Sequence, residues 1–304
     1  MDSLSGDSGY SGAMAARPNR RSFHKAQGRR TGLRRRLARI RRFLQARWNE
    51  FQLMRAALAA APFPFRLIVG GLLLLLIWST VNWTYHAIHK PTELFFPLDD
   101  TLDKNPADTW RQYKSLFVKH STSIITPELL AALAQLESGG NPVARTYWRW
   151  RLTWNPLGVY RPASSAVGLY QITDGTFQEA KRYCIHNHQV VEEGPWHDLR
   201  SCWFNEFYMR VWPTHAVEMT AALLDRRVTQ ILGARRFAAV SLRRKQELAA
   251  VIHLCGAGAG REFVARGFRL TSRQRCGDHD VRHYVARVSI LMREFAKLAA
   301  GTAA

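Results

Sequence analysis

Acidic residues are scarce in this 304-residue chain, which contains 23 Asp and Glu against 44 Lys and Arg. The deficit is greatest over residues 1–66, where 15 basic residues stand against 3 acidic ones. Such a segment favours an anionic partner, such as lipid headgroups, an acidic polymer or nucleic acid. Hydrophobic residues still make up 47% of the chain, which is enough for a substantial core.

Cysteine is absent from the first 183 residues, and the four that follow are Cys184, Cys202, Cys255 and Cys276. An even number confined to one part of the chain predicts two disulfides in an oxidising compartment. Three pairings are open, and we favour the sequential one because both of its loops are short. A zinc site is the alternative, built from Cys184, His186, His188, His197 and Cys202. Its spacing matches no standard zinc pattern, so we expect no metal and no other cofactor.

Charged side chains are also absent from residues 67–88, and about 20 apolar residues suffice for a transmembrane helix. Trp78, Trp83 and Tyr85 gather toward the far end of this segment, as in an interfacial aromatic belt. Arginines crowd the near end, which places the N-terminus in the cytoplasm by the positive-inside rule. The distance from the N-terminus and the lack of a small-residue cleavage site exclude a removed signal peptide. A buried core helix is the alternative.

The segments on either side of this span differ in composition. Residues 1–32 have little apolar content and predict a disordered basic tail. Residues 33–61 predict a basic amphipathic juxtamembrane helix that binds anionic inner-membrane lipids, with apolar positions Leu33, Leu37, Ile40, Leu44, Trp48 and Phe51. A nucleic-acid-binding arm is the alternative. The position beside the span already explains the basic residues, so we expect no nucleic-acid partner. Residues 89–107 contain three prolines and predict a linker.

Residues 108–300 lack a convincing alternating strand pattern and predict an all-α domain. A short hairpin within residues 146–160 is the one exception we consider. Apolar spacing and helix caps predict helices over residues 127–137, 174–182, 213–230, 245–254, 260–265 and from Asp278 onward.

Glu137 is the most unusual acidic residue of this domain, because it ends an apolar helix just before Ser138-Gly139-Gly140. Leu133 and Leu136 lie on the same helix. An apolar setting disfavours the carboxylate and raises the pKa of a glutamic acid. A Glu that keeps its proton near neutral pH can donate it to the leaving oxygen of a glycosidic bond.

Four short sequence motifs, here called patches, follow one another along this domain. They are residues 137–142 (Glu-Ser-Gly-Gly-Asn-Pro), 166–173, 254–260 and 280–285. Together they resemble the lysozyme-like catalytic domain of the soluble-type lytic transglycosylases, which cleave peptidoglycan. The resemblance covers residues 125–298. It implies that Glu137 protonates the leaving oxygen and then deprotonates the 6-hydroxyl of N-acetylmuramic acid, which closes into a 1,6-anhydro product.

The same resemblance implies the substrate-binding residues Ser138, Gly168, Leu169, Gln171 and Tyr284. In the third patch the chain departs from the family. Cys255 stands where the family has a tyrosine near the catalytic Glu, and Gly256 stands where it has an asparagine. This departure puts the partner that orients Glu137 in doubt.

The segment between Glu137 and Gly168 is longer than is usual in the family and is rich in aromatic and arginine residues. Aromatic rings stack on sugar rings, so we expect Trp148 and Trp150 to form an added glycan-binding rim. A packed aromatic flap without a ligand is the alternative.

These observations together predict a single-pass inner-membrane protein of a Gram-negative bacterium, with a cytoplasmic N-terminus and a periplasmic lysozyme-like domain. The expected reaction is cleavage of the β-1,4 bond between N-acetylmuramic acid and N-acetylglucosamine in peptidoglycan glycan strands. A lysozyme-type hydrolase and an inactive peptidoglycan-binding scaffold are the alternatives. An envelope-spanning secretion or conjugation apparatus is a further candidate partner.

Overall fold

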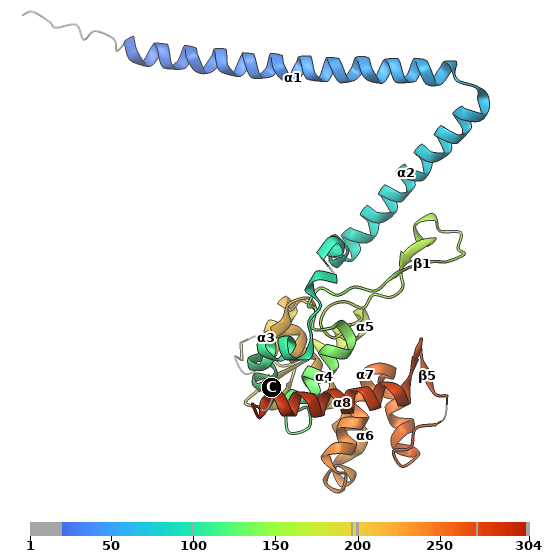
Figure 1. Ribbon diagram of the computed structural model, residues 1–304. Coiled ribbons are helices and arrows are strands. Elements are labelled where there is room, and N and C mark those ends of the chain that lie inside the picture. The colour runs from blue at the N-terminus through green and yellow to red at the C-terminus, as the bar shows by residue number, and fades with distance from the viewer. Residues whose placement is uncertain (1–19, 99, 196, 199–200, 272, 302–304) are drawn as a thin grey trace, which may run out of the picture. The chain divides into compact units, whose positions relative to one another are not determined.

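The computed structural model describes residues 20–98, 100–195, 197–198, 201–271 and 273–301 (Figure 1). The chain divides into two compact units, Met1–Trp78 and Ser79–Ala304, which we describe separately. Most of the predicted basic tail, residues 1–19, lies outside the described residues.

The first unit contains helix α1, Arg20–Ala60, and the first part of α2, Phe63–His89. The helix α1 begins well before the predicted start at Leu33, because residues 20–32 contain no proline and several good helix formers. It ends before Pro62 and Pro64. Most of its described apolar side chains are exposed, and they include Phe43, Leu44, Trp48 and Phe51.

The predicted span, residues 67–88, lies within α2. With 27 residues at 1.5 Å each, α2 is about 40 Å long, which is enough to cross a membrane. None of its most apolar stretch is buried. Helix α7, Leu242–Ala265, is also long and apolar enough, but it is partly buried as a core helix of a soluble domain would be.

The predicted linker is a packed segment rather than a free connection. It contains two short 3-10 helices, η1 (Pro91–Leu98) and η2 (Asp100–Leu102). Glu93 is fully buried and accepts a hydrogen bond of 2.7 Å from the Trp148 indole N–H. It also pairs with Arg145 at 3.1 Å and with Lys90 at 3.4 Å. This buried cluster holds the segment after α2 against the rest of the second unit.

The second unit is mainly helical, as predicted, with α3 (Pro106–Lys119), α4 (Pro127–Ser138), α5 (Asp174–Ala180), α6 (Pro213–Ala239), α7 (Leu242–Ala265) and α8 (Val281–Ala299). Helix α3 was absent from the predicted helices. The predicted pair 245–254 and 260–265 is one helix, α7, with a kink at Gly256, where φ is 80°. Helix α6 extends past its predicted end and contains a similar kink at Gly233.

Helix α4 forms the centre of the core. Pro127 occupies its first turn, and Gly139 ends it in the left-handed conformation, with φ of 58°. Its side chains from Leu129 to Ala134 are fully buried. It packs mainly against α8 and α3, where the ring of Trp110 lies 5.7 Å from that of Phe295. An apolar helix surrounded in this way is held rigidly, and it carries Glu137 in its last turn.

The described strands form three antiparallel pairs: β1 (Trp148–Trp150) with β2 (Tyr160–Pro162), β3 (Tyr183–His186) with β4 (Gln189–Glu192), and β5 (Arg275–Cys276) with β6 (His279–Asp280). The first pair is the hairpin considered from the sequence, and its loop contains η3, Pro156–Gly158. The other two pairs were missed, because strands of two to four residues are too short to show an alternating pattern.

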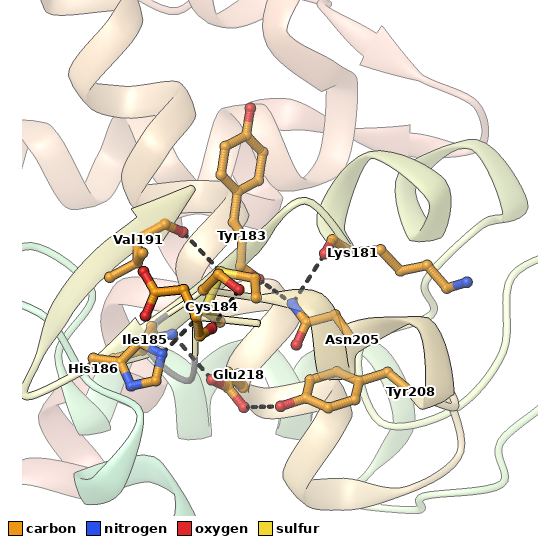
Figure 2. The surroundings of a disulfide bond; sticks show 12 residues. Lys181, Tyr183, Cys184, Ile185, His186, Val191, Asn205, Tyr208 and Glu218 are labelled. Atoms are coloured by element: carbon orange, nitrogen blue, oxygen red, sulfur yellow. Dashed lines mark hydrogen bonds between the residues drawn. A yellow bond between two sulfur atoms is a disulfide. The ribbon is translucent and has the colours of Figure 1, made fainter. Parts of the chain in front are cut away.

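Both disulfides follow the sequential pairing, Cys184–Cys202 and Cys255–Cys276. The Cys184–Cys202 disulfide contains both cysteines of the zinc site considered above. Figure 2 shows that it lies in a polar cluster beside η4, Trp203–Phe207. There the buried Glu218 of α6 accepts hydrogen bonds from the Ile185 N–H at 3.0 Å and the Tyr208 hydroxyl at 2.6 Å. The disulfide and these bonds hold β3 and η4 on α6.

Candidate active site

A cleft of about 1190 Å³ opens in the second unit beside the end of α4. Its walls come from helices α4 to α8, the segment that leads into β1, residues 164–173 and the loop after β5. The lining residues include Glu137, Tyr147, Gln171, His253 and Tyr284. The Glu137 side chain is 17% exposed, so one end of it reaches the cleft while the rest is enclosed.

Two side chains from different helices meet the Glu137 carboxylate. The Tyr284 hydroxyl, from α8, donates a hydrogen bond to Glu137 Oε1 at 2.5 Å. His253 Nε2, from α7, lies 3.5 Å from the same oxygen. Among the described residues both of these contacts go to Oε1, which leaves Oε2 as the oxygen available to a ligand.

These contacts reverse the expected direction of the Glu137 pKa. Burial alone raises this pKa, because it disfavours the charged form. The hydrogen bond and positive charge of His253, with the hydrogen bond from Tyr284, outweigh burial and bring the pKa below its ordinary value. The prediction of a raised pKa was wrong, because it considered the leucines of α4 and not the donors that α7 and α8 supply.

Tyr284 remains a proton donor over the whole working range of pH. Burial is the main cause that raises its pKa well above the ordinary value, and the charge and hydrogen bond of Glu137 act in the same direction. The sequence had named Tyr284 from the fourth patch. The structure places it against the carboxylate, where it fixes the orientation of Oε1.

His253 is the residue that the sequence analysis missed. The family's tyrosine corresponds to Cys255, and that cysteine is bonded to Cys276. The side chain that reaches Glu137 from this helix lies two residues earlier and is an imidazole. A polar residue inside the apolar run Ala249 to Leu254 was the available signal, but the position alone could not show which way it faced.

The second disulfide forms part of the cleft wall. Cys255, Gly256, Cys276 and Gly277 all line the cleft, and the bond joins the kink of α7 to the β5–β6 turn. The kink starts directly after the cysteine, at Gly256. The disulfide therefore braces the part of α7 that positions His253.

The second patch contains residues that line the cleft and residues that lie behind it, and Gly168 and Leu169 are among the latter. Leu169 is fully buried, and its carbonyl accepts a 2.9 Å hydrogen bond from the Ser138 hydroxyl. Gly168 has φ of 78°, and a Cβ there would lie 2.6 Å from the Arg210 carbonyl oxygen. The close approach that requires this glycine is therefore to protein backbone, not to a glycan. Ser138, Gly168 and Leu169 thus hold the loop on α4, which differs from the substrate-binding role expected of them.

Of the substrate-binding residues expected in this patch, Gln171 is the one that lines the cleft. Its amide nitrogen donates to the carbonyl oxygens of Ala144 and Gly168, both at 3.1 Å. These two carbonyl oxygens, and not the Glu137 carboxylate, hold this nitrogen.

The aromatic insertion is the aromatic-rich part of the segment between Glu137 and Gly168. Its first residues line the cleft, whereas its tryptophans do not. Thr146 and Tyr147 are lining residues, and the Tyr147 hydroxyl donates to Asp278 at 3.3 Å. Trp148 is instead tied to the buried Glu93. Trp150 is largely exposed and lies tilted against Tyr160, with ring centroids 4.7 Å apart. The expected rim of Trp148 and Trp150 is therefore not part of the cleft lining.

The cleft carries more basic than acidic side chains. Arg145, Arg227, Arg287, His253, His279 and His283 line it, against Glu137 and Asp280. Asp280 accepts a hydrogen bond of 2.8 Å from the His283 N–H and so caps α8. Such a lining is complementary to a neutral or anionic polymer rather than to a cationic one.

Residues 115–244 match the family described as the transglycosylase SLT domain. The matched region contains Glu137 and the second patch, and ends shortly before His253. No curated protein and no solved structure matches this chain.

Proposed function

We propose that this chain, in which residues 115–244 form a transglycosylase SLT domain, is a membrane-anchored lytic transglycosylase. The SLT domain makes peptidoglycan its substrate class. The observation that supports the finer reaction is the carboxylate of Glu137, held through Oε1 by Tyr284 and His253 at the edge of the cleft, while the carboxylate of Asp280 caps α8. One carboxylate is what a mechanism without an attacking water requires.

In this mechanism Glu137 acts through Oε2. The protonated carboxyl donates its proton to the oxygen that bridges N-acetylmuramic acid and N-acetylglucosamine, and the bond from this oxygen to the anomeric carbon of N-acetylmuramic acid breaks. The resulting carboxylate then accepts the proton of the 6-hydroxyl, which bonds to the anomeric carbon as the 1,6-anhydro ring closes. Tyr284 and His253 stabilise the carboxylate between the two steps. The arginines of the cleft, such as Arg287, meet the carboxylates of the wall peptides.

The mass of the products tests the proposal. The full chain, purified in detergent, should release fragments from sacculi whose muramic acid ends carry the 1,6-anhydro ring, one water lighter than hydrolysed ends. Fragments with hydrolysed ends would support the lysozyme-type alternative, in which Asp280, the other carboxylate among the described lining residues, would assist a water. The absence of any fragment would contradict both and favour an inactive wall-binding scaffold.

The lowered pKa of Glu137 gives a pH dependence with a definite sign. Glu137 must carry a proton to act as the acid, so activity should fall as the pH rises through its pKa. Replacing His253 by Gln removes the positive charge that favours the carboxylate, and burial then raises the pKa. The descending limb of the pH–rate profile should therefore move to higher pH in His253→Gln.

Initial rates of sacculus digestion from about pH 3 to 8 measure this shift, because the wild-type limb lies below the ordinary glutamate pKa of about 4.3. His283→Gln is the matched control, because His283 lies in the same cleft and its backbone, not its ring, is bonded to Asp280. We expect its profile to match that of the wild type. A descending limb that stays in place in His253→Gln would show that His253 does not set the protonation of Glu137.

We further propose that α2 crosses the inner membrane once and leaves the SLT domain in the periplasm. Its exposed apolar side chains and the arginines that precede it support this arrangement. The two disulfides of the second unit fit an oxidising compartment. The basic side chains of α1 would then lie on anionic lipids of the cytoplasmic face, and a secretion or conjugation apparatus remains a candidate partner.

A further inference from the structure

The β1–β2 hairpin ends in a group of apolar side chains that the cleft does not use. Leu152 and Trp154 are fully exposed, and Trp150 is 68% exposed. Arg149 and Arg151 alternate with them and are exposed as well. Figure 1 shows this hairpin projecting away from helices α4 to α8. Exposed apolar side chains gathered at one site mark a surface that contacts a partner.

The same hairpin is bound to the last turns of α2, within the second unit. The Asn82 side chain donates a hydrogen bond to the Tyr160 carbonyl oxygen at 2.7 Å. His86 Nε2 lies 2.9 Å from the Leu157 carbonyl oxygen, and its ring meets the Trp148 ring edge-on at 5.2 Å. Asn82 and Ala87 are buried as a result. The hairpin thus covers one face of α2 at this end.

If α2 spans the membrane as proposed above, these contacts determine how deep in the bilayer the hairpin lies. Lys90 is the first charged residue after the span, and Asn82 precedes it by eight residues, or about 12 Å of helix. That length carries the hairpin to the boundary between headgroups and hydrocarbon. An asparagine at this depth requires a polar partner, and the Tyr160 carbonyl supplies it.

We propose that the loop 149–154 docks on the periplasmic interface of the membrane that α2 crosses. This inference rests on the proposed membrane anchoring. Trp150, Leu152 and Trp154 enter the interfacial layer, where tryptophan is enriched, while Arg149 and Arg151 pair with lipid phosphates. A glycan is the other occupant considered for this insertion, and the absence of Trp148 and Trp150 from the cleft lining argues against it.

Docking of this loop would also limit the distance between the active site and the membrane. Tyr147 lines the cleft, and seven residues separate it from Trp154, or about 23 Å of extended chain. The cleft is therefore held close to the membrane surface. Its substrate is then the glycan that lies nearest to the membrane rather than the outer layers of the wall.

Fluorescence quenching by lipids tests this placement in the full chain. All four cysteines are in disulfides, so one added cysteine is the only free thiol for a polarity-sensitive fluorophore. Three labelled variants, Leu152→Cys, Leu72→Cys in α2 and Ile290→Cys in α8, are reconstituted in vesicles of phosphatidylethanolamine and phosphatidylglycerol. The vesicles carry nitroxide lipids with the spin label at either shallow or deep positions.

We expect shallow nitroxides to quench the label at position 152 severalfold more than the label at 290, and deep nitroxides to quench the label at 72. Quenching at 72 without quenching at 152 would overturn the docking and leave the anchoring intact. No quenching at 72 would overturn the anchoring, and the docking with it. Protection of position 152 from aqueous iodide only after peptidoglycan fragments are added would identify glycan as the occupant and also overturn the proposal.

Discussion

Glu137→Gln should lower the rate of fragment release from sacculi by about 10³-fold, the middle of the range that a general acid contributes. Glutamine preserves the size of the side chain and can still accept the hydrogen bond that Tyr284 donates to Oε1. It has no proton to donate to the leaving oxygen and cannot accept one from the 6-hydroxyl. Both chemical steps therefore fail while the cleft keeps its shape.

Glu128→Gln is the control for this variant, because Glu128 lies in the first turn of the same helix, α4. Its activity should equal that of the wild type. Binding of Glu137→Gln to sacculi should also remain, since the arginines that line the cleft are unchanged. Equal activity of Glu137→Gln and the wild type would refute the assignment of the acid and direct attention to Asp280.

Removal of the Cys255–Cys276 disulfide should lower both stability and activity. The bond closes a loop with a sequence separation of 21 residues, so the Cys255→Ala, Cys276→Ala variant should lose about 3 kcal/mol of unfolding free energy. The variant also frees the kink of α7 beside His253 from the β5–β6 turn. A displacement of about 1 Å among catalytic groups can reduce a rate by about 10²-fold, and we expect a loss of that order.

The other disulfide provides a matched control, since its sequence separation is 18 residues and its loss should cost a similar free energy. Cys184 and Cys202 do not line the cleft, so Cys184→Ala, Cys202→Ala should keep most of its activity at temperatures well below its Tm. Urea unfolding measures the stability of both variants, and sacculus digestion measures their activity. Equal losses of activity in the two variants would show that the second disulfide acts only through global stability.

The helical class of the second unit could be predicted because apolar residues recur at helical spacing over long stretches. Thr126-Pro127 and Gly139 mark the two ends of α4, and the structure has that helix from Pro127 to Ser138. The hairpins β3–β4 and β5–β6 could not be predicted, since their strands are too short for alternation to show. The packed character of residues 90–102 depends on Arg145 and Trp148, which lie about 50 residues away in the sequence.

By itself, the sequence determined the place of Glu137 at the end of an apolar helix, the order of the four patches and the uncharged stretch within α2. These are local properties, which neighbouring residues specify through spacing, capping and composition. Only the tertiary structure decided which donors surround the carboxylate and in which direction they shift its pKa. It also decided that the hairpin of the aromatic insertion binds the end of α2 and that Trp148 and Trp150 stay out of the cleft lining. Such contacts join segments far apart in the chain, and packing brings those segments together in ways that no spacing in the sequence records.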